Sequence, residues 1–195
     1  EKNGLIEYLD LTPIYCRHLA SFIDIDCLRQ SRMKVIVDSM YGAGSGYFKT
    51  LLNGESLEVT EINSERNPIF PGIQPEPIVA NLTKLSATVK EQRANVGFAT
   101  DGDADRIGII DENGVFLTQL QVFALLTLYL LDIRGERGPI VKTITTTSMI
   151  DRLGEIFSVP VYETTVGFKY VAPVIEEKNA LIGGEESGGY GFRGH

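Results

Sequence analysis

Residues 96–111 read VGFATDGDADRIGIID, and this stretch decides how the chain is expected to fold. The flanking runs 96–100 and 107–110 are short, apolar and partly β-branched, which is typical of buried strands. The segment between them, DGDADR, is then a tight connection that leaves the end of a strand. Ligands of α/β sheets bind at the ends of strands. The stretch therefore predicts a buried sheet that carries a ligand site at its edge.

The connection holds three carboxylates at alternate positions, Asp101, Asp103 and Asp105, followed by Arg106. Like charges crowded into one loop repel and raise one another's pKa, so a cation between them is the simplest source of stability. A ligand set made only of oxygen atoms favours a hard cation, Mg²⁺ or Ca²⁺, over Zn²⁺. The spacing therefore predicts a metal site.

The acidic run allows three other interpretations. A calcium-binding EF-hand loop needs Gly at its sixth position, which is Arg106 here, and the flanks are strand-like. An aspartyl-phosphate phosphatase of the haloacid dehalogenase type would use Asp101 as nucleophile and Asp103 as acid. Such enzymes usually carry the nucleophile near the N-terminus, whereas Asp101 lies in mid-chain. The third interpretation is a solvated acidic turn, which does not account for the arginine that follows three spaced aspartates.

Composition limits the class of protein. The chain has 195 residues, of which 43% are hydrophobic and 23% charged, as expected of one large or two small globular domains. A net charge of -8 argues against a nucleic-acid or anionic-membrane partner. The longest apolar stretch, 122–131, falls short of the ~20 residues that a bilayer requires. We expect a cytoplasmic protein, and the first residue, Glu1, and the Gly-rich end suggest an excised piece of a longer chain.

Strand and helix patterns alternate along the chain, which predicts the α/β class. Thr12 is expected to cap a helix that Pro13 opens. The first series comprises strands at 34–38, 57–62, 96–100 and 107–111, a Gly-rich turn at 42–46, helices at 47–52 and 78–91, a Pro-rich connection at 67–77 and a hairpin turn at 112–114. The second comprises helices at 119–131, 147–157 and 170–176 and strands at 140–143, 159–162 and 181–182.

This order predicts two consecutive three-layer α/β/α domains with mixed sheets, covering residues 1–114 and 115–195. The glycines of the 42–46 turn are expected to permit close packing of a strand on a helix.

Three loops, DGDADR at 101–106, VGFKY at 166–170 and GEESGG at 184–189, together resemble the α-D-phosphohexomutase family of phosphoglucomutases and phosphomannomutases. Residues 35–46, VIVDSMYGAGSG, are similar to the start of that family's second domain. The resemblance implies a four-domain enzyme of which this chain is the middle pair, without the first and fourth domains. Such enzymes interconvert hexose 1-phosphate and hexose 6-phosphate of glucose or mannose, through a hexose bisphosphate and a phosphoserine of the first domain, with Mg²⁺.

The resemblance also implies roles for single residues. The three aspartates would bind Mg²⁺, and Arg106 and Lys169 would be catalytic. Arg106 would contact a phosphoryl oxygen, unless it forms a salt bridge that only steadies the loop. Lys169 would contact a substrate phosphate or hydroxyl, or transfer a proton, unless it is an exposed lysine at a helix start.

Gly167, Glu185 and Ser187 are implied as substrate-binding residues, the last two at the sugar hydroxyls O3 and O4. The chain has Gly189 where many members of the family have His, and His195 is a possible substitute. Glu186 favours the glucose and mannose branches over the glucosamine branch, again by resemblance. Because the phosphoserine is absent, the isolated chain is expected to be inactive. A non-catalytic module that binds sugar phosphates is therefore a further hypothesis, beside the mutase and the phosphatase.

Overall fold

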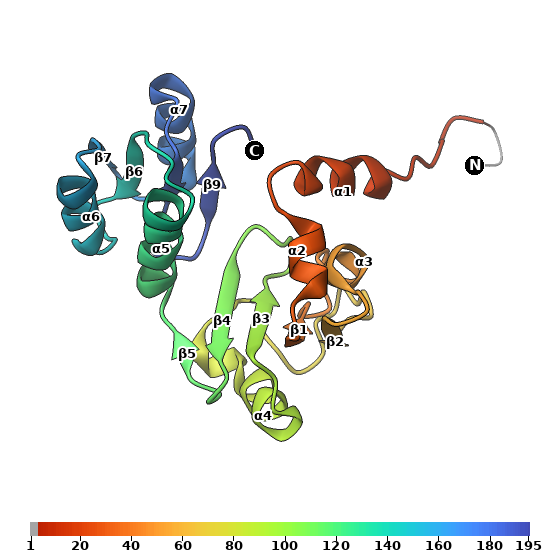
Figure 1. Cartoon of the computed structure of the whole chain (residues 1–195). Helices are drawn as coiled ribbons and strands as arrows, with labels where there is room; N and C mark the ends of the chain where they lie inside the picture. The colour runs from red at the N-terminus through yellow and green to blue at the C-terminus, as the bar shows by residue number, and fades with distance from the viewer. Residues whose placement is uncertain (1–3) are drawn as a thin grey trace.

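The computed structural model describes residues 4–195, which form two mixed sheets that follow one another along the chain (Figure 1). The strand order is β2-β1-β3-β4-β5 in the first sheet and β7-β6-β8-β9 in the second. In each sheet the first pairs are parallel and the last are antiparallel. The predicted α/β class with two consecutive units and mixed sheets is confirmed.

The first unit contains α1 (Thr12–Ala20), α2 (Ile25–Gln30), β1 (Lys34–Asp38), α3 (Tyr47–Leu52), β2 (Glu58–Ile62), a 3-10 turn (Val79–Asn81), α4 (Thr83–Gln92), β3 (Val96–Thr100), β4 (Ile107–Asp111) and β5 (Phe116–Leu117). Successive side chains of β1 point to opposite faces of the sheet, as the pleat of a strand requires. Ile36 packs in the cluster that includes α4, whereas Val35 and Val37 pack in the cluster that includes α3. The sheet is therefore covered by helices on both faces.

The second unit contains α5 (Gln119–Leu128), a π-helical extension (Tyr129–Ile133), β6 (Ile140–Thr143), α6 (Met149–Phe157), β7 (Val161–Thr164), α7 (Phe168–Lys178), β8 (Ile182–Gly184) and β9 (Tyr190–Phe192). Ile140 of β6 packs in the cluster that includes α5 and α6, and its neighbour Val141 packs in the cluster that includes α7. Helices again cover both faces. Among residues 4–195 no helix has the length and apolar character needed to cross a bilayer.

Several boundaries differ from the predictions. Thr12 is not the N-cap of α1, because Leu11 occupies that position and Asp10 accepts a bond from the Thr12 N–H at 3.0 Å. The helix predicted at 78–91 begins only at Thr83, because Ile78 is extended and a 3-10 turn intervenes. β7 begins at Val161, β8 extends to Gly184, and β9 was not predicted.

The division of the chain between residues 114 and 115 stays a prediction. β5, which follows this point, still pairs with β4 of the first sheet through Ile109–Leu117 and Ile110–Phe116.

Candidate functional site

The acidic loop, residues 101–106, connects the C-terminal end of β3 to the start of β4, two neighbouring strands inside the first sheet. Asp101 is buried, and Asp103 and Asp105 are exposed, yet each offers one carboxylate oxygen within 4.8 Å of the other two. The loop closes on itself through the Ala104 N–H, which donates to the Asp101 carbonyl at 3.2 Å, with Ala104 at φ +65°. Three converging carboxylates at this spacing fit a hard divalent cation.

Arg106 is the main partner of the buried carboxylate. Its backbone N–H donates to Asp101 Oδ1 at 3.0 Å, and its Nε donates to Asp101 Oδ2 at 2.8 Å. Its Nη1 donates to Glu76 Oε1 at 3.1 Å. Burial alone would raise the pKa of Asp101, but the two bonds and the charge from Arg106 outweigh it and hold that pKa below its ordinary value. Asp101 is therefore an ionised anchor of the loop.

Asp105 has the opposite balance. Burial, the bond to Asp101 and the charges of Asp101 and Asp103 raise the pKa of Asp105 above its ordinary value, and the charge of Arg106 only partly opposes them. This repulsion is what a bound cation would relieve. The environment of Asp101 also argues against the phosphatase alternative, since that carboxylate is 1% exposed and both of its oxygens accept bonds from Arg106.

The Gly-rich turn packs against the acidic loop, a contact that sequence reasoning did not foresee. A Cβ on Gly42 would lie 2.6 Å from the Gly102 carbonyl oxygen and 2.9 Å from that of Asp101. The Ala43 N–H donates to the same Gly102 carbonyl at 3.0 Å, and the Gly102 N–H donates to the Pro75 carbonyl at 3.2 Å. The expectation that these glycines serve strand-on-helix packing is corrected here for Gly42, whose contact is with the acidic loop.

We expect Gly42→Ala to lower the free energy of unfolding by about 1 to 3 kcal/mol, since the added methyl group would collide with two carbonyl oxygens that belong to the backbone. Because those carbonyls belong to the acidic loop, divalent-cation binding should weaken as well. Gly46→Ala is the control. Gly46 has φ +83°, so a side chain there would strain the backbone, but an added Cβ would meet no neighbouring atom. Thermal melts and metal titration of both variants would measure the difference. Equal effects of the two substitutions on metal binding would contradict this account.

Residues 184–189, which the resemblance implies to be sugar-binding and which we call the sugar loop on that expectation, lie against the acidic loop. The Ile107 N–H, at the start of β4, donates to the Gly188 carbonyl at 3.2 Å. Glu185 is half-buried, and its Oε1 accepts from Ser187 Oγ at 2.5 Å. The structure therefore brings Glu185 and Ser187 together, beside the residues that follow the three aspartates. A groove of about 890 Å³ adjoins this junction, and its lining includes Asp103, Arg106, Gly188 and apolar side chains of α1.

Glu186 points to a different partner. Its Oε2 accepts from Thr143 Oγ1, in the last residue of β6, at 2.9 Å and also from Thr145 Oγ1, just after that strand. Burial would raise the pKa of Glu186, but these hydroxyl bonds outweigh it and lower that pKa. The sugar loop is thus tied to β6 through Glu186 and to β4 through Gly188.

Lys169 and Gly167 lie apart from these contacts. Lys169 is exposed in the first turn of α7, with its Nζ 5.1 Å from the centre of the Tyr170 ring. Gly167 precedes that helix with φ +116°. Among the described residues no hydrogen bond or ion pair joins Lys169 to the acidic loop or the sugar loop. The His195 ring stacks on the His18 ring of α1, with 5.2 Å between the ring centroids.

Sequence reasoning missed three residues that hold the site in place. Glu76 lies in the Pro-rich connection, and Thr143 and Thr145 lie at the end of β6 and just after it. Their partners are 30 to 43 residues away in the chain. No spacing along the sequence reveals pairs that are so far apart. The one available signal is general: polar residues in loops at strand ends are often part of a binding site.

Two family models match the chain. Residues 13–114 match the model described as "Phosphoglucomutase/phosphomannomutase, alpha/beta/alpha domain II". Residues 119–195 match the model of domain III of the same proteins. The two matches follow one another without overlap and carry the acidic loop and the sugar loop respectively.

Relatives and solved structures agree with these matches. A protein of Thermococcus kodakarensis named phosphoglucomutase/phosphomannomutase is 36% identical over 189 residues, which is 97% of this chain and 41% of that protein. A probable phosphoglucosamine mutase of Methanococcoides burtonii is 40% identical over 85% of this chain and 37% of its own. The crystal structure of a putative phosphomannomutase from Thermus thermophilus superposes with a TM-score of 0.91 at 38% identity, over 98% of this chain and 44% of that one. The chain thus spans about two-fifths of the length of these proteins.

Proposed function

The chain belongs to the phosphoglucomutase/phosphomannomutase family, and we propose that it supplies the metal site and the sugar-binding loop of a hexose-phosphate mutase. In this proposal the whole protein interconverts hexose 1-phosphate and hexose 6-phosphate. A phosphoserine in a preceding domain gives its phosphoryl group to the monophosphate, which becomes a bisphosphate. The bisphosphate then returns its other phosphoryl group to the serine. We propose that residues 1–195 by themselves are inactive, because the family models that they match are those of domains II and III and the proposed phosphoserine belongs to a preceding domain.

One observation carries the proposal. The Ile107 N–H to Gly188 carbonyl bond joins the strand that follows the acidic loop to the loop that contains Glu185 and Ser187. A phosphate beside the three aspartates and a sugar ring beside Glu185 would therefore belong to one substrate. If residues 101–106 were only a solvated acidic turn, their contact with a second Gly-rich loop would be unexplained.

The proposed roles follow from the donors and acceptors present. Asp101, Asp103 and Asp105 would hold Mg²⁺, which when bound would neutralise charge on the transferring phosphoryl group. The Arg106 guanidinium is 29% exposed beside them, where it can donate to a phosphoryl oxygen. Glu185 would accept hydrogen bonds from sugar hydroxyls, and Ser187 would add a donor. Lys169 and Gly167 would approach the substrate from α7, which packs against β8 and β9.

The proposed substrates are hexose phosphates as a class. Relatives of this chain carry names for glucose, mannose and glucosamine substrates. The Glu186 carboxylate, whose Oε2 is bonded to two threonine hydroxyls, faces the end of β6, so the glucose and mannose preference proposed from Glu186 rests on the resemblance of the motif.

In the whole protein, Glu185→Ala should lower kcat/KM on hexose phosphates by about tenfold to a hundredfold. Removing the acceptor leaves sugar hydroxyls unpaired, which costs about 1.5 to 3 kcal/mol when the acceptor is charged. The melting temperature should barely change, because the only side-chain partner of Glu185 is the Ser187 hydroxyl among the described residues.

Glu112→Ala is the matched control, since Glu112 lies in the hairpin turn and its side chain, within residues 4–195, accepts only from the neighbouring Asn113 side chain. Glu112→Ala should change neither kcat/KM nor the melting temperature. A large fall in the melting temperature of Glu185→Ala with kcat/KM retained would show that Glu185 is structural and that the sugar loop is assigned wrongly.

A further inference from the structure

Arg106 places a permanent positive charge at the acidic loop. Its Nε lies 2.8 Å from Asp101 Oδ2 and 3.7 Å from Asp105 Oδ1. An arginine cannot lose its proton in a protein, so the guanidinium competes with any divalent cation for the same carboxylates. The loop therefore holds a cation that competes with the metal and already lies 3.7 Å from Asp105 Oδ1.

Glu76 binds a terminal nitrogen of that guanidinium from outside the acidic loop. Its Oε1 accepts from Arg106 Nη1 at 3.1 Å, and its side chain is 44% exposed. With Nε bonded to Asp101 and Nη1 bonded to Glu76, the plane of the guanidinium is fixed by two carboxylates. Asp105 Oδ1 is left in a longer ion pair with Arg106 Nε, at 3.7 Å.

The backbone of Glu76 is held firmly enough to act as an anchor. Its N–H donates to the Gln74 carbonyl at 2.8 Å, and its carbonyl accepts from the Ile78 N–H at 2.9 Å and from Asn81 Nδ2 at 2.9 Å. The carbonyl of the preceding residue, Pro75, accepts from the Gly102 N–H of the acidic loop. Glu76 is thus fixed relative to the loop whose arginine it contacts.

We propose that Glu76 is a positioning residue of the metal site, which holds the Arg106 guanidinium away from Asp105 so that Asp105 stays available to a divalent cation. This inference rests on the proposed metal site. Without Glu76 the guanidinium would turn onto Asp105 and occupy one of the three metal ligands. Glu76 therefore acts through Arg106, without touching the metal or the substrate.

A double-mutant cycle read by Mn²⁺ titration of this chain separates that mechanism from a simple charge effect. In the wild-type chain Glu76→Ala should weaken Mn²⁺ binding about tenfold, the size expected of coupled neighbours in one charge network. In an Arg106→Gln background, where the rival cation is gone, Glu76→Ala should weaken Mn²⁺ binding about twofold or less, the part due to the lost charge alone. Glu76→Gln, which keeps a neutral acceptor, should fall between wild type and Glu76→Ala.

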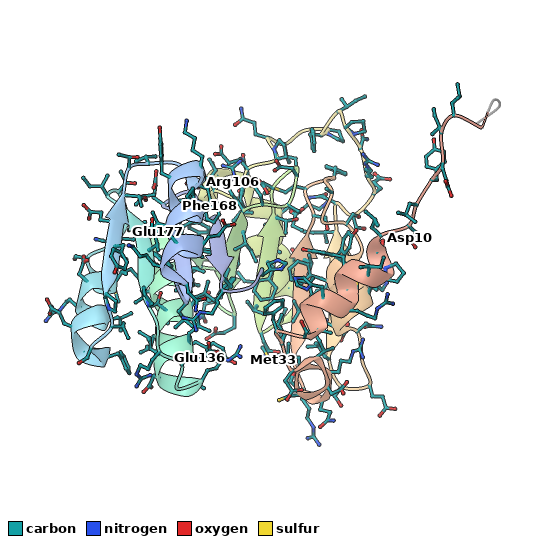
Figure 2. The ribbon with its side chains drawn as sticks, turned by 90° about the horizontal axis from the view of Figure 1, so that it is seen from above. Asp10, Met33, Arg106, Glu136, Phe168 and Glu177 are labelled. Carbon is teal, nitrogen blue, oxygen red and sulfur yellow. The ribbon has the colours of Figure 1, made fainter. Side chains whose placement is uncertain are left out.

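The matched control is Glu136→Ala, which breaks a similar pair, since Glu136 Oε1 lies 2.8 Å from Arg134 Nε. In Figure 2 Glu136 lies on the opposite side of the molecule from Arg106, so this variant should leave Mn²⁺ binding unchanged. Thermal melts report whether each variant folds, and Arg106→Met is the second background if Arg106→Gln does not. Equal weakening by Glu76→Ala in both backgrounds, or none in the wild type, would overturn the inference while leaving the metal site intact. Absence of Mn²⁺ binding by the wild-type chain would overturn the proposed metal site together with it.

Discussion

Asp101→Ala is expected to lower the free energy of unfolding of the chain by about 2 to 4 kcal/mol, which for a chain of this size is a fall in melting temperature of roughly 5 to 15 °C. Removing one partner of a buried ion pair is costly because the other charge loses its compensation. Asp101 is 1% exposed, and its carboxylate accepts the Arg106 backbone N–H as well as the guanidinium. The loss of unfolding free energy should stay below that for a fully buried pair, because the Arg106 side chain is 29% exposed and retains its ion pair with Glu76.

Asp103→Ala, two residues away, is the matched control. The Asp103 side chain is exposed and makes no hydrogen bond or ion pair within residues 4–195. Surface substitutions of this kind usually change stability by about 0.5 kcal/mol or less. Thermal melts of both variants should be recorded without divalent metal, so that only the protein's own contacts are compared. A similar fall for both substitutions would show that Asp101 is not the anchor of the loop.

The strands that position the site could be predicted from the sequence because their apolar runs are packed between layers of helices. β1, β3, β4 and β6 begin and end where the apolar runs 34–38, 96–100, 107–111 and 140–143 predict. Such runs are clearest when they are short and bounded by turn residues. The acidic loop was found for the same reason, since it is the connection from β3 to β4.

Features that depend on distant partners could not be predicted. β9 (Tyr190–Phe192) lies in a Gly-rich run with no strand pattern and exists because it pairs with β8. The late start of α4 depends on the fold of the Pro-rich connection, where the Asn81 side chain bonds the Glu76 carbonyl. The Arg106–Glu76 pair joins two residues that are 30 positions apart, so no local spacing reveals it.

The second large effect expected is on the metal. Asp103→Asn together with Asp105→Asn should weaken Mg²⁺ binding by about two orders of magnitude, because two of the three anionic ligands become neutral. The fold should survive, since both side chains are exposed and Asp101 keeps its bonds to Arg106. Without metal the melting temperature should stay level or rise slightly, because the substitutions remove the repulsion among the carboxylates, which adds to burial in raising the pKa of Asp105.

The measurement that tests the central claim most directly is calorimetric titration of Mg²⁺ into this chain and into the Asp103→Asn, Asp105→Asn variant, with thermal melts of both at each metal concentration. The claim is that residues 101–106 form the metal site of a phosphohexomutase. It predicts saturable binding at one site in the wild-type chain, a rise in melting temperature with Mg²⁺, and loss of both in the variant. Equal Mg²⁺ binding by the two chains would contradict it.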